Sequence, residues 1–181
     1  MAETGFALFD TAIGSCAVAW SERGILGVQL PETDATRTGA RMRRRFPRTR
    51  ETTPPAQVQR AIDGIVALIG GEAIDFSAVA LDMERVPAFH RRVYEVARTI
   101  SCGATLTYGE IAKRLAVPAE AREVGEAMGR NPFPIIVPCH RVLAAGGKLG
   151  GFSAPGGSQA KLRMLALEGL DLAPAQRSLG L

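Results

Sequence analysis

The stretch at residues 131–141 reads Asn-Pro-Phe-Pro-Ile-Ile-Val-Pro-Cys-His-Arg, so a cysteine is directly followed by a histidine. Two prolines precede the apolar run Ile135–Val137 and a third follows it. This pattern predicts a buried, rigid backbone that leaves Cys139 little freedom to move. A neighbouring imidazole or cation can lower a cysteine pKa from about 8.5 to roughly 3.5–7.5, and the thiolate is the nucleophilic form. Because most free cysteines are small buried hydrophobes, the Cys139-His140 pair alone leaves a structural role open.

Two short helices are expected just before this stretch. Thr107-Tyr-Gly-Glu110 is a capping box, which satisfies backbone N–H groups at a helix start and predicts a helix to about Leu115. Val117-Pro118 interrupts it, and Ala119–Gly129 predicts a second helix that is rich in small residues. Two helices with a tight turn are typical of a helix-turn-helix, although helical hairpins also occur in many proteins that do not bind DNA.

A change of pattern at Asp82–Pro87 predicts a domain boundary near residue 85, and so two domains at 1–85 and 86–181. A helix is expected from Pro87 to about Ile100, with His90 on its solvent side. Its expected apolar face consists of Phe89, Val93, Val96, Ala97 and Ile100.

The amino-terminal half predicts a small α+β unit without a nucleophile, acid and base arrangement of its own. Its expected strands are Phe6–Phe9, Cys16–Trp20, Ile25–Leu30 and Phe76–Leu81, the first three as an antiparallel meander. Its expected helices are Thr33–Phe46 and Pro55–Ile69, the second with an apolar face of Val58, Ile62, Ile65, Val66 and Ile69.

Arginines are concentrated between positions 37 and 50. They are Arg37, Arg41, Arg43, Arg44, Arg45, Arg48 and Arg50. Such a patch can attract a polyanion, but charge runs are more often the solvated face of a helix, and we favour that interpretation.

The chain has 181 residues, 46% hydrophobic and 22% charged, which is ordinary for one large or two small globular domains. No apolar run approaches the roughly 20 residues that a spanning helix needs, and the first residues lack the basic and apolar regions of a signal peptide. We therefore expect a cytoplasmic protein without a membrane partner.

The cysteines Cys16, Cys102 and Cys139 are widely spaced and odd in number, which argues against a disulfide framework and for a reducing compartment. Cys16 lies in an apolar run and is expected in the core. With only two histidines, His90 and His140, no structural zinc site is expected. The net charge of +4 permits nucleic-acid binding but also describes many proteins with anionic substrates.

Taken together, four segments resemble the O6-alkylguanine-DNA alkyltransferases, which are also called methylated-DNA–protein-cysteine methyltransferases. The segments are Thr107–Ala112, Ala121–Gly125, Asn131-Pro132 and Pro138–Val142, and the match extends to Gly151–Ser153 and Glu168. The resemblance covers residues 87–170 and, more loosely, the amino-terminal half. It implies an α+β protein, with an RNase H-like amino-terminal domain followed by a mainly helical domain that contains a helix-turn-helix.

The resemblance also implies the chemistry. Such a protein moves an alkyl group, typically methyl, from O6 of guanine, and from O4 of thymine, to its own cysteine, once and irreversibly. Cys139 would be the acceptor and His140 its base through a water molecule. Glu168 would orient the imidazole, Asn131 would tie the helix-turn-helix to the active-site segment, and Tyr108 would stabilise the leaving guanine. No cofactor or metal is implied.

Double-stranded DNA with O6-alkylguanine would be the partner of a monomeric protein, bound in the minor groove with the damaged base flipped out. Arg122 would fill the vacated base stack, Ala121 and Gly125 would allow close approach, and Arg130 would contact DNA. The pocket positions would be Met128, Pro134, Val142, Phe152 and Ser153.

The chain departs from the family pattern at three places. Phe152 stands where many members have tyrosine, the Gly150–Gly157 loop is longer than usual, and Glu123 and Glu126 lie on the expected recognition helix. The preferred adduct size and the use of thymine lesions therefore stay open. Rival interpretations are a non-catalytic lesion sensor, a Cys-His hydrolase on another fold, and a DNA-binding regulator. The presence of Cys139 beside a helix-turn-helix pattern disfavours all three.

Overall fold

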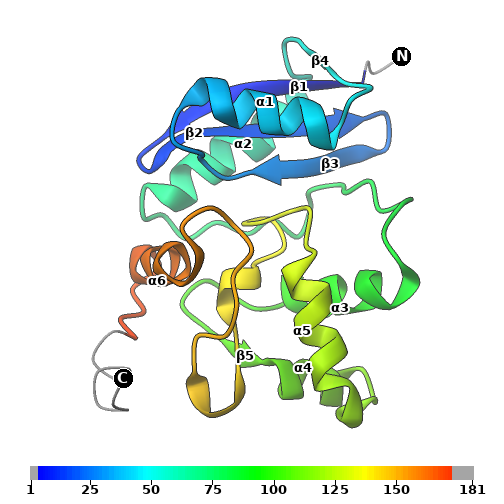
Figure 1. Ribbon diagram of the computed structural model, residues 1–181, viewed down its shortest axis with the longest axis vertical. Helices are drawn as coiled ribbons and strands as arrows, with labels where there is room; N and C mark the ends of the chain where they lie inside the picture. Colours follow the sequence, from blue (N-terminus) through cyan, green and yellow to red (C-terminus); the bar gives the residue numbers. More distant parts are fainter. Residues whose placement is uncertain (1–3, 173–181) are drawn as a thin grey trace. The chain divides into compact units, whose positions relative to one another are not determined.

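The computed structural model describes residues 4–172, and the chain folds into two compact units (Figure 1). One unit takes in the chain up to Arg85 together with Pro132–Ile136, and the other takes in Val86–Asn131 and the chain from Val137 onward. The sequence did not predict that Pro132–Ile136 groups with the first unit. Residues 1–3 and 173–181, which belong to the two expected domains, lie outside the described residues.

The first unit contains a four-stranded sheet in the order β3-β2-β1-β4. Its strands are β1 (Gly5–Thr11), β2 (Gly14–Ser21), β3 (Gly24–Gln29) and the short β4 (Arg50–Glu51). β1, β2 and β3 pair antiparallel, which confirms the expected meander, and β4 adds an unexpected parallel pairing with β1. Gly24 begins β3 with φ of +140°, and a Cβ there would lie 2.4 Å from the carbonyl oxygen of Ala80, so the close approach requires glycine.

Helices α1 (Ala35–Arg45) and α2 (Ala56–Ile69) lie on opposite faces of this sheet (Figure 1). Asp34 caps α1 by accepting a hydrogen bond from the backbone N–H of Arg37. Met42 of α1 packs on Phe6 of β1 in a buried cluster. Both helices confirm the expected ones, but Val66 is 38% exposed, so it does not belong to the buried face of α2.

The expected strand Phe76–Leu81 is wrong. The segment contains a turn, and only Leu81 forms an isolated parallel bridge, with Ile25. The Asp75 carboxylate accepts hydrogen bonds from the backbone N–H and the hydroxyl group of Ser77 at 2.8 Å each, which favours a turn. Local hydrogen bonding therefore outweighs the β propensity of the apolar residues.

The arginine-rich segment is mostly paired with nearby groups. Arg41 lies 3.2 Å from Glu32 and Arg43 lies 2.7 Å from Glu51. Arg45 is turned inward: its Nη1 donates to the carbonyl oxygen of Val28 at 2.8 Å, and burial lowers its pKa to about 10. Its Nη2 also donates to the carbonyl oxygen of Pro132 at 3.2 Å, within the same unit.

The second unit is mainly helical. Its elements are α3 (Ala88–Arg98), β5 (Leu106–Thr107), α4 (Tyr108–Arg114), the 3-10 turn η1 (Pro118–Glu120), α5 (Ala121–Gly129), the 3-10 turn η2 (Cys139–Arg141), β6 (Val142–Leu143), the 3-10 turn η3 (Ala145–Gly147) and α6 (Gly157–Leu167). The capping box of Thr107 and Glu110 is present at the start of α4, as predicted. α3, α4 and α5 contact one another, and β5 pairs parallel with β6.

The buried face of α3 differs from the expected one. His90 is half-buried rather than at the surface, because its ring lies 6.1 Å from the ring of Tyr94, and burial lowers its pKa. Tyr94 itself is buried, and its hydroxyl group donates to the carbonyl oxygen of Ala127 at 2.8 Å. Phe89 and Val96 are only half-buried. The buried face of α3 is therefore rotated toward Tyr94.

On α6, Lys161, Met164 and Leu165 are buried, whereas Ala166 is exposed. Glu168 follows as the C-cap of the helix. Among the helices of residues 4–172, none is long and apolar enough to cross a membrane.

Candidate active site

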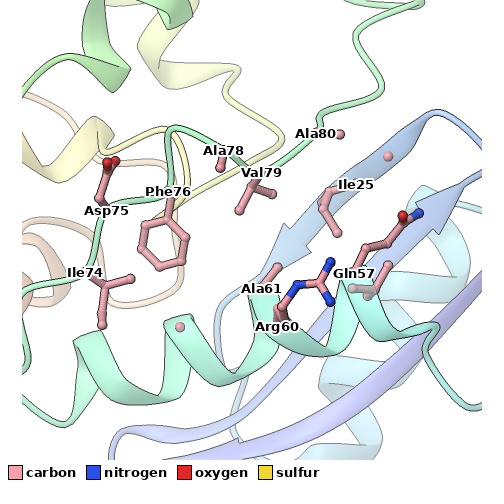
Figure 2. A pocket seen from close by; sticks show the side chains of 13 residues that line it. Ile25, Gln57, Arg60, Ala61, Ile74, Asp75, Phe76, Ala78, Val79 and Ala80 are labelled. Atoms are coloured by element: carbon pink, nitrogen blue, oxygen red, sulfur yellow. The ribbon is translucent and has the colours of Figure 1, made fainter.

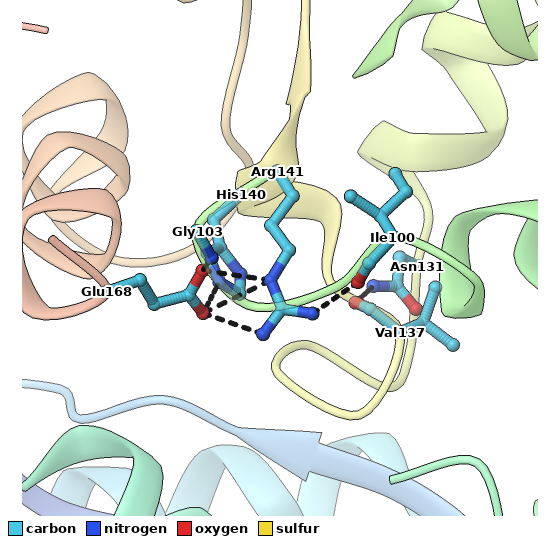
Figure 3. Close-up of polar contacts among 7 residues, drawn as sticks. All are labelled: Ile100, Gly103, Asn131, Val137, His140, Arg141 and Glu168. Atoms are coloured by element: carbon cyan, nitrogen blue, oxygen red, sulfur yellow. Dashed lines mark hydrogen bonds and ion pairs between the residues drawn. The ribbon is translucent and has the colours of Figure 1, made fainter. Parts of the chain in front are cut away.

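The backbone around Cys139 is held by a shared carbonyl group. Asn131, two residues after α5, donates from Nδ2 to the carbonyl oxygen of Val137 at 2.9 Å. The backbone N–H of Cys139 donates to the same oxygen at 2.8 Å. Cys139 then begins the 3-10 turn η2 and is 7% exposed. Asn131 thus links the end of α5 to the turn that carries the thiol, as Figure 3 shows.

His140 and Glu168 form a buried hydrogen-bonded pair (Figure 3). His140 Nε2 lies 2.7 Å from Glu168 Oε1, and each side chain is 1% exposed. Burial alone would raise the pKa of Glu168, but hydrogen bonds from His140 and Arg141 outweigh it and lower the pKa to about 2. Glu168 is therefore ionised and can only accept, so Nε2 of His140 must carry the proton and Nδ1 is left as an acceptor.

The ionisation of His140 and Cys139 is governed first by burial. Burial lowers the pKa of His140, against the opposing effect of Glu168, which favours an uncharged imidazole. Burial raises the pKa of the Cys139 thiol, while a hydrogen bond with the Asn131 side chain and the charge of Lys161 act in the opposite direction. A buried thiol of this kind needs a base to become a nucleophile.

Arg141 completes the polar cluster, and the sequence analysis gave it no role. Its Nη2 donates to Glu168 Oε1 at 2.8 Å, and its Nε donates to Glu168 Oε2 at 2.9 Å. Its Nη1 donates to the carbonyl oxygen of Ile100 at 2.5 Å. Nothing in the local sequence indicated this partner, because Glu168 lies on another element.

Lys161 is a second charged residue of the site that the sequence did not predict, and its charge acts on Cys139. Its side chain is fully buried, and Nζ donates to the carbonyl oxygens of Val142 and Leu149 at 2.6 Å each. Burial lowers its pKa to about 8. Lys161 and Glu168 are seven residues apart and so lie on the same side of α6 and its C-cap, but no signal in the sequence indicated that a lysine would be buried there.

Tyr108, the first residue of α4, is half-buried between two glycines. A Cβ at Gly125 of α5 would lie 3.8 Å from its ring, and a Cβ at Gly150 would lie 2.9 Å from its hydroxyl oxygen. Burial raises the pKa of Tyr108, and a negative charge on Cys139 would raise it further. Its hydroxyl group therefore stays protonated and can donate a hydrogen bond.

The residues expected to contact DNA lie on or next to α5. The side chain of Arg122 is 89% exposed, with its Nε 4.0 Å from the carboxylate of Glu126. Arg130 and Glu123 are exposed, whereas Ala121 and Gly125 are half-buried. An ion pair of this kind at the surface contributes little to stability, so Arg122 is available for another partner.

The expected pocket residues differ in exposure. Met128 and Val142 are buried, Phe152 is half-buried and Ser153 is exposed, all in the second unit. Pro134 is half-buried and groups with the first unit, so the structure does not join it to the other four.

A cavity of about 380 Å³ lies within the first unit, between α2 and residues 74–80 (Figure 2). Its lining includes Gln57 and Arg60 of α2 but neither cysteine nor histidine. Across residues 4–172, no group of His, Cys, Asp and Glu side chains is placed to hold a metal ion.

Comparison with known proteins assigns the chain to a family. Residues 88–170 match the family model for the DNA-binding domain of 6-O-methylguanine DNA methyltransferase. A methylated-DNA–protein-cysteine methyltransferase of Mycobacterium tuberculosis is 44% identical over 132 residues, which is 73% of this chain and 77% of that protein. The chain belongs to the methylated-DNA–protein-cysteine methyltransferase family.

Other members of the methyltransferase family support the same assignment. The protein from Methanothermobacter thermautotrophicus is 37% identical over 122 residues, 67% of each chain. The crystal structure of M. tuberculosis OGT in complex with DNA covers 91% of this chain and 92% of its own, with a TM-score of 0.73 and 34% identity. The predicted family and the predicted α+β class are confirmed.

Proposed function

We propose that this methyltransferase repairs DNA by moving the alkyl group of O6-alkylguanine, and of O4-alkylthymine, to Sγ of Cys139. The observation that carries the proposal is a buried thiol next in sequence to an imidazole whose Nε2 proton is committed to Glu168. Because Nδ1 of His140 is then the proton acceptor, the Cys139–His140–Glu168 set can generate a thiolate.

The transfer needs no cofactor, because the proton, the alkyl group and the electron pair each have an acceptor. The thiol proton passes through a water molecule to Nδ1 of His140, and the thiolate attacks the alkyl carbon. The C–S bond forms as the C–O6 bond breaks, and the electron pair of that bond goes to the guanine. Tyr108 donates its hydroxyl hydrogen bond to the leaving base, which offsets the charge that develops there. A thioether offers no route back to the thiol, so each molecule acts once.

DNA is engaged by α4 and α5 as a helix-turn-helix in the minor groove. The half-buried small residues Ala121 and Gly125 permit close approach, and exposed Arg122 enters the base stack when the damaged nucleotide rotates out. Arg130, exposed after α5, contacts the phosphates, and such contacts make the affinity fall with salt. Met128, Val142, Phe152 and Ser153 of the second unit surround the flipped base.

The two domains divide these tasks. Residues 1–85, with an RNase H-like plan, support the chain, and residues 86–181 bind DNA and accept the alkyl group. The meander followed by α1 and α2 supports the first assignment, and the α4–α5 pair supports the second. The protein acts as a monomer.

Incubation with duplex DNA that carries radiolabelled O6-methylguanine tests the proposal. We expect one methyl group per protein molecule, bound to Cys139, and none on the Cys139→Ala variant. Cys16→Ala is the matched control, since Cys16 is also a buried free cysteine but lies in β2 of the first unit, and its loss should leave transfer intact. Label that stays on the DNA, or several transfers per molecule, would exclude this function.

A further inference from the structure

The carboxylate of Glu168 is shared rather than dedicated to His140. Oε1 lies 2.7 Å from His140 Nε2 and 2.8 Å from Arg141 Nη2, while Oε2 accepts from Arg141 Nε at 2.9 Å and from the backbone N–H of Gly103 at 3.4 Å. Figure 3 shows the guanidinium between this carboxylate and the carbonyl group of Ile100. The Arg141 side chain is 6% exposed and that of Glu168 is 1% exposed, so little solvent screens the pair.

Charged and titratable groups from three elements surround the cluster of His140, Arg141 and Glu168. Cys139 and Arg141 are the neighbours of His140 in η2, Lys161 and Glu168 belong to α6 and its C-cap, and Cys102 lies in the turn before β5. Glu168 is the only acid among them. A proton on His140 would therefore add a third positive charge, beside Arg141 and Lys161, to a buried cluster with one carboxylate.

We infer that Arg141 is a positioning residue that shares the Glu168 carboxylate with His140 and so keeps the imidazole uncharged until it takes the proton of Cys139. This role rests on the proposed function of His140 as the base. In a simple histidine–carboxylate pair, the negative charge stabilises imidazolium, and the base would already be occupied by a proton. With Arg141 in place the carboxylate still orients the ring through Nε2, but its charge is largely neutralised.

The geometry requires arginine and not merely a cation. Nε and Nη2 bind the two carboxylate oxygens as a fork, while Nη1 reaches Ile100 on the opposite side. A lysine presents one ammonium group and cannot make this set of contacts. Arg141→Lys therefore keeps a positive charge with poorer placement, whereas Arg141→Met removes the charge.

Titration of the imidazole by NMR tests the inference, with His90 as the internal reference because the chain has only two histidines. In the wild-type protein we expect His140 to be uncharged at pH 7. In Arg141→Met its proton affinity should rise at least tenfold, with a smaller rise in Arg141→Lys and no change at His90. Nδ1 and Nε2 shifts should show the Nε2-protonated tautomer in the wild type.

Two results would overturn the role of Arg141. One is a charged His140 in the wild-type protein at pH 7, which needs no variant. The other is a His140 titration that Arg141→Met leaves unchanged in a folded protein, because then the arginine only braces the structure. The labelled-DNA assay is separate: an uncharged, Arg141-dependent His140 in a protein that transfers no methyl group would refute the proposed function but not the charge sharing.

Discussion

The hydroxyl group of Tyr108 lies against Gly150, only 2.9 Å from the position that a Cβ would take there. Gly150 also has φ of +66°, which costs other residues about 1–2 kcal/mol. Gly150→Ala should therefore displace the tyrosine and slow alkyl transfer about tenfold, equivalent to about 1.4 kcal/mol. The second-order rate with methylated duplex DNA measures this effect.

Gly151→Ala is the matched control, because a Cβ at Gly151 would meet no atom within 4 Å among the described residues. Its transfer rate should stay within about twofold of the wild type. Equal rates for the two variants would remove the proposed contribution of Tyr108.

Replacing Lys161 should make Cys139 less reactive. The buried ammonium group lowers the pKa of the thiol, so Lys161→Met should slow the reaction of Cys139 with O6-benzylguanine by roughly tenfold at pH 7. Because the pKa of Lys161 is about 8, the wild type loses this charge above that pH, and the difference in rate should shrink there. Rates measured from pH 6 to pH 9.5 test both expectations.

Lys148→Met provides the comparison for a lysine that is exposed. The variant should react like the wild type at every pH. Since Lys161→Met also leaves the carbonyl groups of Val142 and Leu149 without their donor, rates are compared per folded molecule, with the folded fraction taken from urea unfolding.

The parts of the fold that could be predicted from sequence depend on local signals. The capping box of α4 and the short apolar runs of the meander are signals that act within a few residues, and both were placed correctly. The strand expected at Phe76–Leu81 failed because Asp75 and Ser77 form a turn that the apolar pattern does not show. The apolar residues of this segment are compatible with a strand, so only the hydrogen bonds of Asp75 and Ser77 could have predicted the turn.

Only part of the candidate site could be predicted, because the rest depends on contacts between residues that are distant in the sequence. Cys139 and His140 are adjacent, and family resemblance supplied Glu168. Arg141 and Lys161 were missed because their role depends on which side of η2 and α6 faces the interior. A buried lysine contradicts the usual preference of that side chain for water, so periodicity alone would place it outside.

Glu168 should make stability depend on acid pH. Its pKa is about 2 in the folded protein and 4.5 ordinarily, so the carboxylate stabilises the fold fully above pH 4.5 and loses this contribution as the pH falls toward 2. The contribution is at most about 3 kcal/mol. Glu168→Gln should be less stable than the wild type at pH 7, and the difference should narrow at pH 2.5 in urea unfolding.

Glu123→Gln removes an exposed carboxylate from α5 and should be as stable as the wild type at pH 7. A deficit of Glu168→Gln that stays constant from pH 7 to pH 2.5 would mean that the charge of Glu168 does not stabilise the fold.

Arg122 should matter for duplex DNA and not for the chemistry. Its side chain is 89% exposed, so Arg122→Ala should leave stability unchanged. Since rotating a base out of the duplex costs a few kcal/mol, loss of the residue that fills the gap should slow duplex repair about tenfold or more. The reaction with free O6-benzylguanine should stay within about twofold. Arg163→Ala replaces an exposed arginine of α6 and is the control. Equal losses on both substrates for Arg122→Ala would exclude a role of Arg122 in base flipping.

Alkylation should destabilise the protein. Cys139 is 7% exposed, and its backbone N–H shares the carbonyl oxygen of Val137 with Asn131, so an added methyl group must displace a fixed neighbour. Overpacking of this kind costs about 1–3 kcal/mol, and about 2–4 °C of melting temperature is lost per kcal/mol in a chain of this size. The S-methylated protein should therefore melt roughly 2–12 °C below the free form, and the benzylated protein lower still. The melting temperature of Cys139→Ser should not change on treatment with O6-benzylguanine. Equal melting temperatures for the free and the methylated protein would show that the site accommodates the adduct without strain.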